Sequence, residues 1–324
     1  MAHRKKRKSR FRPLLPPLLA LVLGTAVLGG LYVYGARQRT PMADELTAAP
    51  DGGAPLSLWQ QQEPYTAAAE ENAAEETAES APEYPYEEIL RQEEGLTIYR
   101  IQGKRYKAVL AVIDDPKRLY VGTLDTYGWY GQTLEQIMEG SDALLGVNGG
   151  GFQDLNGEGN GSTPIGVVMV DGEFRWGGPG GEYDACAFDK DGKLHVGRMT
   201  GYQMQEWGVQ YAVSYGPCLI QDGVIQEQVN PYLEPRTAVG QREDGSVLLM
   251  IIEGRQVGAL GVSYKEEAEI MAAYGAINAT NMDGGASSVI LYEHEMLNHP
   301  NGLAGMRTIP SAILVRRLGE EAAE

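Results

Sequence analysis

Cysteine and histidine are scarce in this sequence, and their scarcity limits the kinds of site it can build. The 324 residues include two cysteines and four histidines. Cys186 and Cys218 both lie in strand-like runs, and they either form one disulfide in an exported domain or stay as two buried thiols. None of the histidines has a metal-ligand spacing such as His-Glu-x-x-His. Gly-x-Ser-x-Gly and Walker sequences are absent too, which argues against a motif-defined serine hydrolase or P-loop enzyme.

Basic side chains are missing from residues 40–88, which contain twelve acids and no lysine or arginine. Alanine, glutamate and proline recur there ("YTAAAEENAAEETAESAPEYP"), and such a composition cannot bury a core. We therefore predict an acidic Ala/Glu/Pro-rich disordered linker over residues 37–88, which as a flexible coil would span ~40 Å. A partly helical stalk is the alternative, and either form would hold the folded part away from a membrane.

Charge is absent from residue 13 to about residue 34, and this run is about as long as a bilayer core requires. Seven lysines or arginines precede it within residues 1–12. The sequence predicts a basic cytoplasmic tail over 1–12, a single transmembrane signal-anchor helix over 13–36 and an extracytoplasmic remainder. A cleaved signal peptide is the alternative, although Tyr34 stands where the small-x-small cleavage pattern before Ala36 requires a small residue. The expected location is a cell membrane, with one span.

Acids outnumber bases in the remainder as well, because residues 89–324 hold 32 acids and 18 bases. Nucleic-acid binding depends on cationic side chains that neutralise phosphates, so we predict no nucleic-acid partner. We assign residues 89–319 to one folded domain and residues 320–324 to a short tail.

The folded part consists mainly of short β-rich runs. Four Asp-Gly pairs, which begin at residues 171, 191, 222 and 244, separate such runs and predict hairpins. The runs are "LTIYRIQ", "YKAVLAVI", "RLYVGTL", "ALLGVN", "IGVVMV", "DACAF", "YAVSYGPCLI", "RTAVGQ" and "SVLLMII".

Two helices interrupt this pattern. One is predicted over about 133–139, with a capping box formed by Thr133 and Gln136. The other is predicted over about 264–274, with Ser263 and Glu266 at capping-box spacing. Gly275 stands where a helix-ending glycine belongs, and "AINATNM" follows as a strand that ends just before Asp283. The sequence therefore predicts an α+β domain of mostly antiparallel or mixed β-sheet with a few packed helices.

Several short motifs occur in a fixed order along the folded part. They are "GVNGGGF" (146–152), "YGPCLIQDG" (215–223), "PRTAVGQREDGSVLLMIIEGRQ" (235–256), "NATNMDGGASS" (278–288), "LN" and "MRTIPSAILV" (306–315). Together these motifs resemble the phosphodiester glycosidase family over roughly residues 95–318. The resemblance implies an enzyme that hydrolyses sugar-1-phosphodiesters and releases free sugar, with no established cofactor and with a divalent metal as one option.

Asp283 is the first catalytic candidate. The resemblance implies an Asp-Gly-Gly-Gly-Ser block, in which this chain has Ala286 as the third small residue. The carboxylate is expected to act as a general base, as a nucleophile or as a metal ligand, and a turn aspartate is the structural alternative. The backbone amides of the two glycines and the two serine hydroxyls are expected to contact phosphate oxygens; these residues are Gly284, Gly285, Ser287 and Ser288.

Asn148 and Gly149 end another apolar strand in a glycine loop. Because both strands finish in a polar residue, Asn148 is expected at the same sheet edge as Asp283. There it either binds a sugar hydroxyl or orients Asp283. Asp154 follows as a weaker candidate for that edge and, with Asp283, as a possible metal ligand; a structural turn is its alternative.

Two arginines stand before buried strands and suit a phosphate clamp. Arg236 begins "RTAVG", and Arg307 begins "RTIPSA". Thr237, which follows Arg236, and Gly149 are further candidates for binding the substrate or its phosphate. A guanidinium fork binds phosphate through two hydrogen bonds, and structural ion pairs are the alternative. Glu253 is a candidate second carboxylate at a position where the family more often has aspartate, and Arg255 is a rim residue.

The sequence leaves three functions open. The preferred one is a hydrolase of glycosyl-1-phosphodiesters that acts on a bacterial envelope glycan or on an exogenous one. The others are a non-catalytic membrane-tethered module for anionic sugar-phosphate polymers and a phosphodiesterase that cuts the P–O bond. Four aromatic residues near glycine loops could stack on sugars, although packing explains any one of them; they are Trp129, Tyr130, Trp176 and Trp207.

Overall fold

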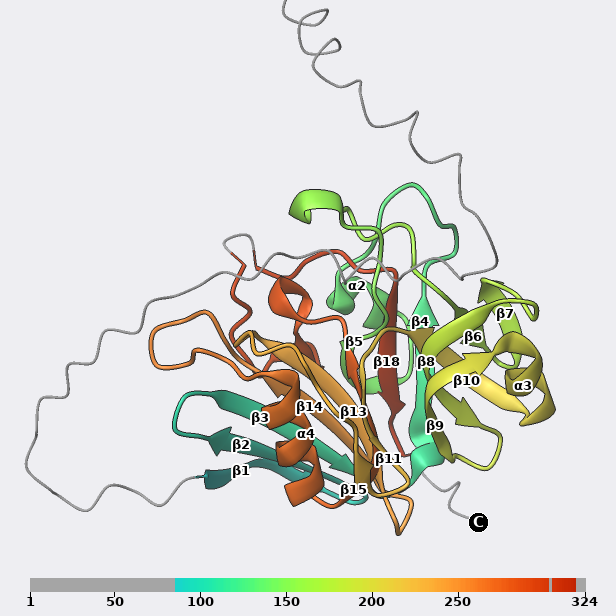
Figure 1. Cartoon of the computed structure of the whole chain (residues 1–324). Coiled ribbons are helices and arrows are strands. Elements are labelled where there is room, and N and C mark those ends of the chain that lie inside the picture. The colour runs from blue at the N-terminus through green and yellow to red at the C-terminus, as the bar shows by residue number, and fades with distance from the viewer. Residues whose placement is uncertain (1–84, 303–304, 319–324) are drawn as a thin grey trace, which may run out of the picture. The chain divides into compact units, whose positions relative to one another are not determined.

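A computed structural model describes residues 85–302 and 305–318 of the chain (Figure 1). The predicted tail at 1–12, signal-anchor at 13–36 and nearly all of the linker lie outside the described residues, as does the tail at 320–324. No helix within 85–302 and 305–318 is long and apolar enough to cross a bilayer. The signal-anchor therefore stays a prediction.

The described residues form three sheets in which every strand pair is antiparallel. The largest sheet has the strand order β1-β2-β3-β14-β13-β15-β11-β12. Its strands are β1 (Tyr86–Glu93), β2 (Leu96–Gln102), β3 (Lys107–Ile113), β14 (Val247–Ile252), β13 (Arg236–Arg242), β15 (Ala276–Met282), β11 (Cys218–Gln221) and β12 (Val224–Ile225). The prediction of a mostly antiparallel β domain is confirmed.

The other two sheets have five strands each and lie beside the large one (Figure 1). The second sheet, in the order β7-β6-β10-β8-β9, contains β7 (Glu173–Trp176), β6 (Val168–Val170), β10 (Val209–Ser214), β8 (Glu182–Asp189) and β9 (Leu194–Thr200). The third, in the order β17-β16-β5-β18-β4, contains β17 (Glu295–Met296), β16 (Ile290–Tyr292), β5 (Ala143–Asn148), β18 (Ser311–Arg316) and β4 (Leu119–Thr123).

All four Asp-Gly pairs lie in hairpin turns, as predicted. They connect β6 to β7, β8 to β9, β11 to β12 and β13 to β14. Asp171 and Gly172 have φ angles of 52° and 79°, so both occupy the left-handed region that a two-residue hairpin turn requires. Glycine tolerates this region without strain, and aspartate does so better than most residues.

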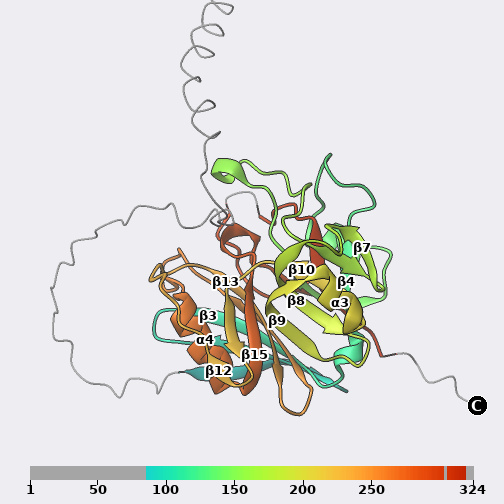
Figure 2. The same ribbon diagram turned by 45° about the vertical axis from the view of Figure 1, so that its right-hand side comes forward.

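Both predicted helices are confirmed, and each begins with a complete capping box. They are α2 (Leu134–Met138), capped by Thr133, and α4 (Tyr264–Ala273), capped by Ser263. Gly275 follows α4 with a φ of 89°, which suits a glycine after a helix end. The α4 helix packs on β11, β13 and β15 at the outer face of the large sheet (Figure 2).

A third helix, α3 (Gly201–Glu206), was not predicted. Thr200 and Gln203 form its capping box, so the sequence signal was present, but the helix has only six residues. Three one-turn 3-10 helices complete the described elements: η2 (Pro116–Arg118), η3 (Leu155–Gly157) and η4 (Gly285–Ser287).

Three details differ from the sequence analysis or settle what it left open. The run at 211–220 is not one strand, because β10 ends at Ser214 and β11 begins at Cys218 in a different sheet. β1 begins at Tyr86, inside the predicted linker. Cys186 and Cys218 are both free thiols, and burial raises their pKa values to about 12 and about 11.

Both faces of the central strands β13 and β15 are buried. On one face, Val239 and Met282 join a core shared with Val147 of the third sheet. On the opposite face, Ala238 packs in a second core that includes Met271 of α4. Because apolar contacts hold these strands on both sides, the residues at their ends have a rigid support.

Candidate active site

β5 and β15 bring Asn148 and Asp283 together. Asn148 ends β5 and is fully buried, and its Nδ2 donates a hydrogen bond to the backbone carbonyl of Asp283 at 2.6 Å. Its Oδ1 accepts hydrogen bonds from the Thr237 hydroxyl at 3.0 Å and the Val289 amide at 3.2 Å. Of the two roles expected for Asn148, this geometry favours the orienting one. Thr237, also fully buried, supports Asn148 and is not placed to touch a substrate.

Asp283 directly follows β15 and is half-buried. Burial raises its pKa to about 6, although the nearby Ser287 hydroxyl and Arg307 guanidinium lower it. The Asp283 Oδ2 atom is buried and accepts no hydrogen bond from the described residues. Ser287 Oγ is likewise buried without a hydrogen-bond partner among them. A carboxyl group with such a pKa and an unused oxygen is suited to accept a proton or to attack a carbon atom.

The loop after Asp283 forms η4 and is tied to the large sheet. The Gly285 amide donates to the Pro235 carbonyl at 3.0 Å, and the Ser288 amide donates to the Gly285 carbonyl at 3.3 Å. Gly285 has a φ of 62°, which glycine adopts without strain. The Gly284 amide helps to lower the pKa of Asp283, so it faces that carboxylate. The Ser288 hydroxyl shares a hydrogen bond with the Thr237 hydroxyl of β13 at 3.2 Å, and the Ser287 hydroxyl is buried near the Asp283 carboxylate.

The glycines after Asn148 permit close packing of the chain. The Gly149 amide donates to the Ser311 carbonyl at 3.0 Å, and the Gly151 amide donates to the Ser214 carbonyl at 3.0 Å. A Cβ atom on Gly150 would lie 2.7 Å from the Ser214 carbonyl oxygen, closer than real Cβ atoms approach. These glycines therefore let the chain pass between β18 and β10, and the Gly149 amide is engaged inside the protein instead of facing a phosphate.

Arg307 and Asp154 form an ion pair beside Asp283. Arg307 Nη1 contacts Asp154 Oδ2 at 2.6 Å, and Nη2 donates to the Gly159 carbonyl at 3.0 Å. The Arg307 side chain is 24% exposed and lies over the Phe152 ring at 4.8 Å. Its hydrogen bond to Asp154 holds the pKa of that carboxyl below its usual range. The charge of Arg307 also lowers the pKa of Asp283, so these two predicted site residues lie within electrostatic range of each other.

Arg236 begins β13 near the Asp283 loop, but its guanidinium is occupied by the protein. It donates to the carbonyls of Val262 at 3.1 Å and Tyr232 at 3.0 Å. It also pairs with Glu234 at 3.4 Å and lies 3.8 Å from the centre of the Tyr264 ring. Only 2% of the side chain is exposed, so the geometry favours the structural alternative over a phosphate clamp.

Glu253 and Arg255 lie at the next strand end, after β14. Glu253 is buried, and its Oε1 accepts a hydrogen bond from the His299 amide at 2.7 Å, so it anchors a loop. Arg255 is about half-exposed and pairs with Glu234 at 2.6 Å. Its Nη1 lies 3.5 Å from the point where a Cβ of Gly285 would be. The structure thus places Arg255, a rim residue in the sequence analysis, beside the Asp283 loop.

Tyr215 is a site residue that sequence reasoning missed. Burial raises the pKa of its hydroxyl, and the charge of Asp283 raises it further, which places the two groups near each other. Its ring packs against Gly151. The signal was its position in the "YGPC" motif, directly before the Gly216-Pro217 pair that connects β10 to β11.

A metal ion has no evident ligand set in the described part of the chain. Residues 85–302 and 305–318 contain no group of three or more His, Cys, Asp or Glu side chains that could hold one. Of the two candidate ligands, Asp154 is engaged by Arg307 and by the Gly159 amide. The suggestion of a metal therefore gains no support from this geometry.

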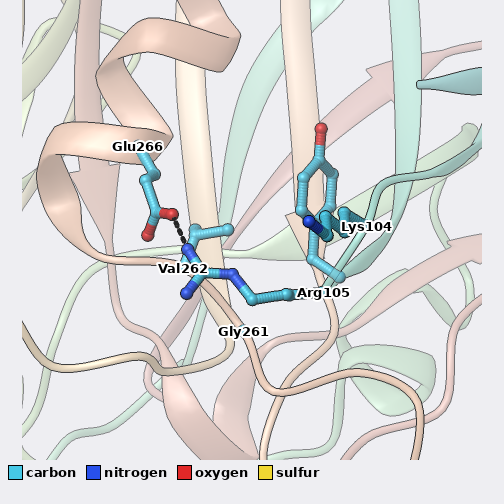
Figure 3. A pocket seen from close by; sticks show the side chains of 6 residues that line it. Lys104, Arg105, Gly261, Val262 and Glu266 are labelled. Carbon is cyan, nitrogen blue, oxygen red and sulfur yellow. Dashed lines mark hydrogen bonds and ion pairs between the residues drawn. The ribbon is translucent and has the colours of Figure 1, made fainter. Parts of the chain in front are cut away.

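A cavity of about 390 Å³ lies apart from these residues, next to the start of α4 (Figure 3). Arg105 and Glu266 form an ion pair within it. Val262, whose carbonyl accepts from Arg236, is also part of its wall. Glu266 is the carboxyl group in the lining, and it is engaged by Arg105 and by Ser263, so the Asp283 region remains the better candidate for chemistry.

The fold and the site define a class of protein: an antiparallel β domain in which a carboxyl group with a raised pKa lies near a partly exposed arginine, an arrangement that suits hydrolysis of an anionic substrate. The chain belongs to the phosphodiester glycosidase family, whose sequence model matches residues 141–316, more than half of the chain. The resemblance inferred from the motifs is confirmed.

Curated relatives are distant and longer than the matched part. The chain is 25% identical over 191 residues to N-acetylglucosamine-1-phosphodiester alpha-N-acetylglucosaminidase of Homo sapiens, a match that covers 52% of this chain and 36% of that protein. It is 26% identical over 198 residues to the SPbeta prophage-derived uncharacterized protein YomE of Bacillus subtilis, covering 57% of this chain and 29% of that protein. The chain thus spans about a third of the length of these relatives.

Solved structures share the fold. The catalytic domain of zebrafish N-acetylglucosamine-1-phosphodiester alpha-N-acetylglucosaminidase, auto-inhibited by its pro-peptide, aligns with a TM-score of 0.56 at 19% identity, over 74% of this chain and 86% of that one. A hypothetical protein from Synechocystis aligns with a TM-score of 0.53 at 17% identity, over 72% of this chain and 64% of that one. At these identities the likeness concerns the fold alone.

Proposed function

We propose that this protein hydrolyses the C1–O bond between a sugar and a phosphate in glycosyl-1-phosphodiesters. Water adds to C1, the bond from C1 to the bridging oxygen breaks, and the products are a free sugar and a phosphate monoester. The observation that carries the proposal is the Asp283 carboxyl group, with a raised pKa and an unused oxygen, beside the Arg307 guanidinium. Family membership supports the same reaction.

The leaving group explains why one free carboxylate is enough. A phosphate monoester has a second pKa of about 6, so it departs without the strong general acid that ordinary glycosides need. Glu253, the candidate second carboxylate, is engaged with the His299 amide and is not required as an acid. Asp283 takes a proton from the attacking water or attacks C1 itself, and Asn148 holds its backbone in place.

Arg307 supplies the positive charge that the departing phosphate needs. It is already paired with Asp154, so a substrate phosphate would share the guanidinium or replace that carboxylate. Arg255, which lies beside Gly285 of the Asp283 loop and is about half-exposed, is a second cation near the site. A domain with 32 acids and 18 bases repels anions at long range, so binding depends on such local cations.

We also propose that the domain works outside the cytoplasm, tethered to a membrane, on an envelope or exogenous glycan. The uncharged run at 13–34 and the basic residues before it support this proposal. Fractionating cells that express a C-terminally tagged chain, followed by protease treatment from outside, tests it. A tagged domain that stays protected while an extracytoplasmic marker is digested would contradict the proposed topology.

The role of Asp283 is tested by the Asp283→Asn variant with a synthetic sugar-1-phosphodiester. Loss of general-base or nucleophilic function should lower kcat by ~10²–10⁴-fold while the variant stays folded. Asp244→Asn, in the turn between β13 and β14, is the matched control and should retain activity. Normal turnover by folded Asp283→Asn would exclude the proposed role.

Hydrolysis in ¹⁸O-labelled water separates the proposed reaction from its alternatives. Cleavage at C1 places the label in the free sugar, whereas cleavage at phosphorus places it in the phosphate product. Binding of the substrate without any product identifies the non-catalytic module. Activity that survives exhaustive chelation removes a divalent metal from the mechanism.

The pH dependence follows from the pKa of Asp283. Because this pKa is about 6 and the acting form is the carboxylate, kcat/KM should rise as the pH increases through about 6 and then level off. The measurement is a pH–rate profile between pH 4.5 and 8, with circular dichroism at each pH as the folding control. A profile that falls through this range would assign Asp283 as an acid instead.

A further inference from the structure

Two loops beside the candidate active site are joined to each other by their backbones. One lies between β4 and α2, the other follows β5, and both project from the same end of the sheets (Figure 1). The Gly128 amide donates to the Ser162 carbonyl at 2.9 Å, and the Gly131 amide donates to the Asn160 carbonyl at 2.9 Å. Asn160 Nδ2 donates to the Trp129 carbonyl at 2.8 Å. These three bonds fix the first loop on the second.

Large apolar side chains on these loops point into solvent. Trp129 is 75% exposed, Tyr130 is 76% exposed and Leu155 on the second loop is 83% exposed. Tyr127 of the same loop behaves differently, because its ring packs edge-on against Trp176 at 5.3 Å and its hydroxyl contacts Thr123. The loop therefore has one anchored aromatic residue and two whose side chains are mostly exposed to solvent. Adjacent exposed apolar side chains on a fixed backbone are typical of a binding surface.

This aromatic surface, defined by Trp129 and Tyr130, is continuous with the phosphate-binding side of the site. Asn160, which holds the Trp129 carbonyl, accepts a hydrogen bond from the Thr308 hydroxyl at 2.8 Å. The neighbouring Gly159 carbonyl accepts from Arg307 at 3.0 Å. The order is therefore Asp283, then Arg307, then the loop of Asn160, and finally the two rings.

We propose that Trp129 and Tyr130 form a subsite for a sugar ring on the aglycone side of the phosphate, so that the preferred substrate is a phosphodiester-linked glycan chain. This proposal rests on the proposed function. If Asp283 faces C1 and Arg307 holds the phosphate, the next unit of the substrate lies over the aromatic surface. Indole and phenol rings stack on the apolar faces of sugars and keep their polar edges in water.

The charge of the domain favours this mode of binding over an ionic one. The folded part has a large excess of acids, and an anionic glycan is repelled at long range. Uncharged rings hold a sugar unit without adding to that repulsion, while Arg307 supplies the local contact to phosphate. A second copy of the chain on the same rings, or a membrane surface, is another possible occupant, and the test below distinguishes them.

The test compares two substrates that share the same sugar-1-phosphate and differ in the aglycone, which is either methyl or a neutral trisaccharide. For the Trp129→Ala, Tyr130→Ala double variant, KM for the trisaccharide substrate should rise about tenfold with little change in kcat, as expected for the loss of two stacked rings. Its kinetics with the methyl substrate should match those of the wild type. Tyr202→Ala, at an equally exposed tyrosine on α3, is the control and should change neither.

Each other outcome overturns the subsite. Unchanged kinetics with both substrates would show that the rings bind no aglycone, and an equal loss with both would show a general defect. A dimer or a vesicle-bound form that the double variant loses, with trisaccharide kinetics unchanged, would assign the surface to self-association or to membrane binding.

Binding of the trisaccharide alone separates this inference from the proposed function. Tryptophan fluorescence of the full chain should change on titration with the free trisaccharide, and the change should be absent in the double variant. This readout needs no hydrolysis, so it can succeed when no sugar-1-phosphodiester is cleaved. If the fluorescence does not change for an enzyme that cleaves the methyl substrate, the subsite is excluded and the proposed reaction is retained.

Discussion

Arg236 and Arg307 each begin an Arg-Thr pair ahead of a buried strand, yet the structure places them in contrasting surroundings. Arg236 is sealed beneath α4, with two backbone carbonyls, Glu234 and the Tyr264 ring around its guanidinium. Arg307 has one backbone carbonyl and one carboxylate and remains 24% exposed. An arginine at the start of a strand requires acceptors, but the packing of the neighbouring elements decides whether a ligand can become one of them.

The surroundings of the two arginines suit different roles, one structural and one in binding. A guanidinium whose donors face fixed carbonyls in a closed core cannot change partners without leaving them unsatisfied, so it stabilises the fold. A guanidinium paired with a half-exposed carboxylate can exchange that partner for a phosphate at small cost, because such ion pairs near solvent contribute little net stability. We therefore assign Arg236 to the scaffold and Arg307 to the substrate.

The largest expected effect is on stability, in the Arg236→Met variant. Removing the guanidinium leaves the carbonyls of Val262 and Tyr232 without their donor and breaks the contact with Glu234, so unfolding should become easier by ~3–5 kcal/mol. The measurement is urea unfolding at neutral pH. Arg198→Met, which removes an exposed arginine paired with two acids on β8, should cost less than ~1 kcal/mol. Equal losses in both variants would contradict the assignment of Arg236 to the scaffold.

The next effect is on activity, in the Arg307→Met variant. Because this guanidinium stabilises the departing phosphate, its loss should lower kcat/KM by ~10²-fold, while the free energy of unfolding changes by less than ~1 kcal/mol. Steady-state kinetics with a sugar-1-phosphodiester and urea unfolding are the two measurements.

Asp154→Asn is the informative companion to Arg307→Met. It removes the ion pair and keeps the guanidinium, so its activity should stay well above that of Arg307→Met. If Asp154→Asn were as inactive as Arg307→Met, the ion pair itself, and not the arginine, would be the functional unit.

Local sequence chemistry predicted the parts of this fold that depend on neighbouring residues. The Asp-Gly turns and the capping boxes at Thr133 and Ser263 involve groups at most a few residues apart, and the structure contains all of them. The strand that ends before Asp283 was also identified, because "AINATNM" directly follows the glycine that ends the preceding helix. Contacts of this range are encoded in short motifs.

The rest depends on contacts between distant segments. Asn148 and Asp283 are 135 positions apart, so the hydrogen bond that assigns Asn148 an orienting role has no local signature. The direction of Arg236 follows from strand alternation, which places it on the same face as Ala238, toward α4. That α4 covers this face depends on tertiary packing. A motif search therefore identifies both arginines but cannot tell which of them is available to a substrate.

The smallest expected effect is on the pH dependence of stability, and it concerns Glu267, which lies near the buried Arg236. This α4 residue is fully buried near Arg236, and neither carboxyl oxygen has a hydrogen-bond partner among the described residues. Burial raises its pKa to about 8, from an ordinary value of 4.5, even though Arg236 acts to lower it. Between these two pH values the unfolded chain releases this proton and the folded chain retains it. The folded state therefore loses stability as the pH rises, by up to ~1.4 kcal/mol per pH unit, and the effect ends above the folded pKa.

Glu267→Gln should remove that part of the pH dependence, since glutamine keeps the shape and does not titrate. At pH 6 the variant should be more stable than the wild type by about 2 kcal/mol, with a larger difference at pH 7.5, and at pH 4.5 the two should be nearly equal. Urea unfolding at pH 4.5, 6 and 7.5 measures this, with Glu269→Gln on the exposed side of α4 as the control. Parallel pH–stability curves for Glu267→Gln and the wild type would mean that Glu267 is ionised beside Arg236. The sealed region would then hold a true ion pair, like the one at Arg307, and the contrast between the two arginines would rest on solvent exposure alone.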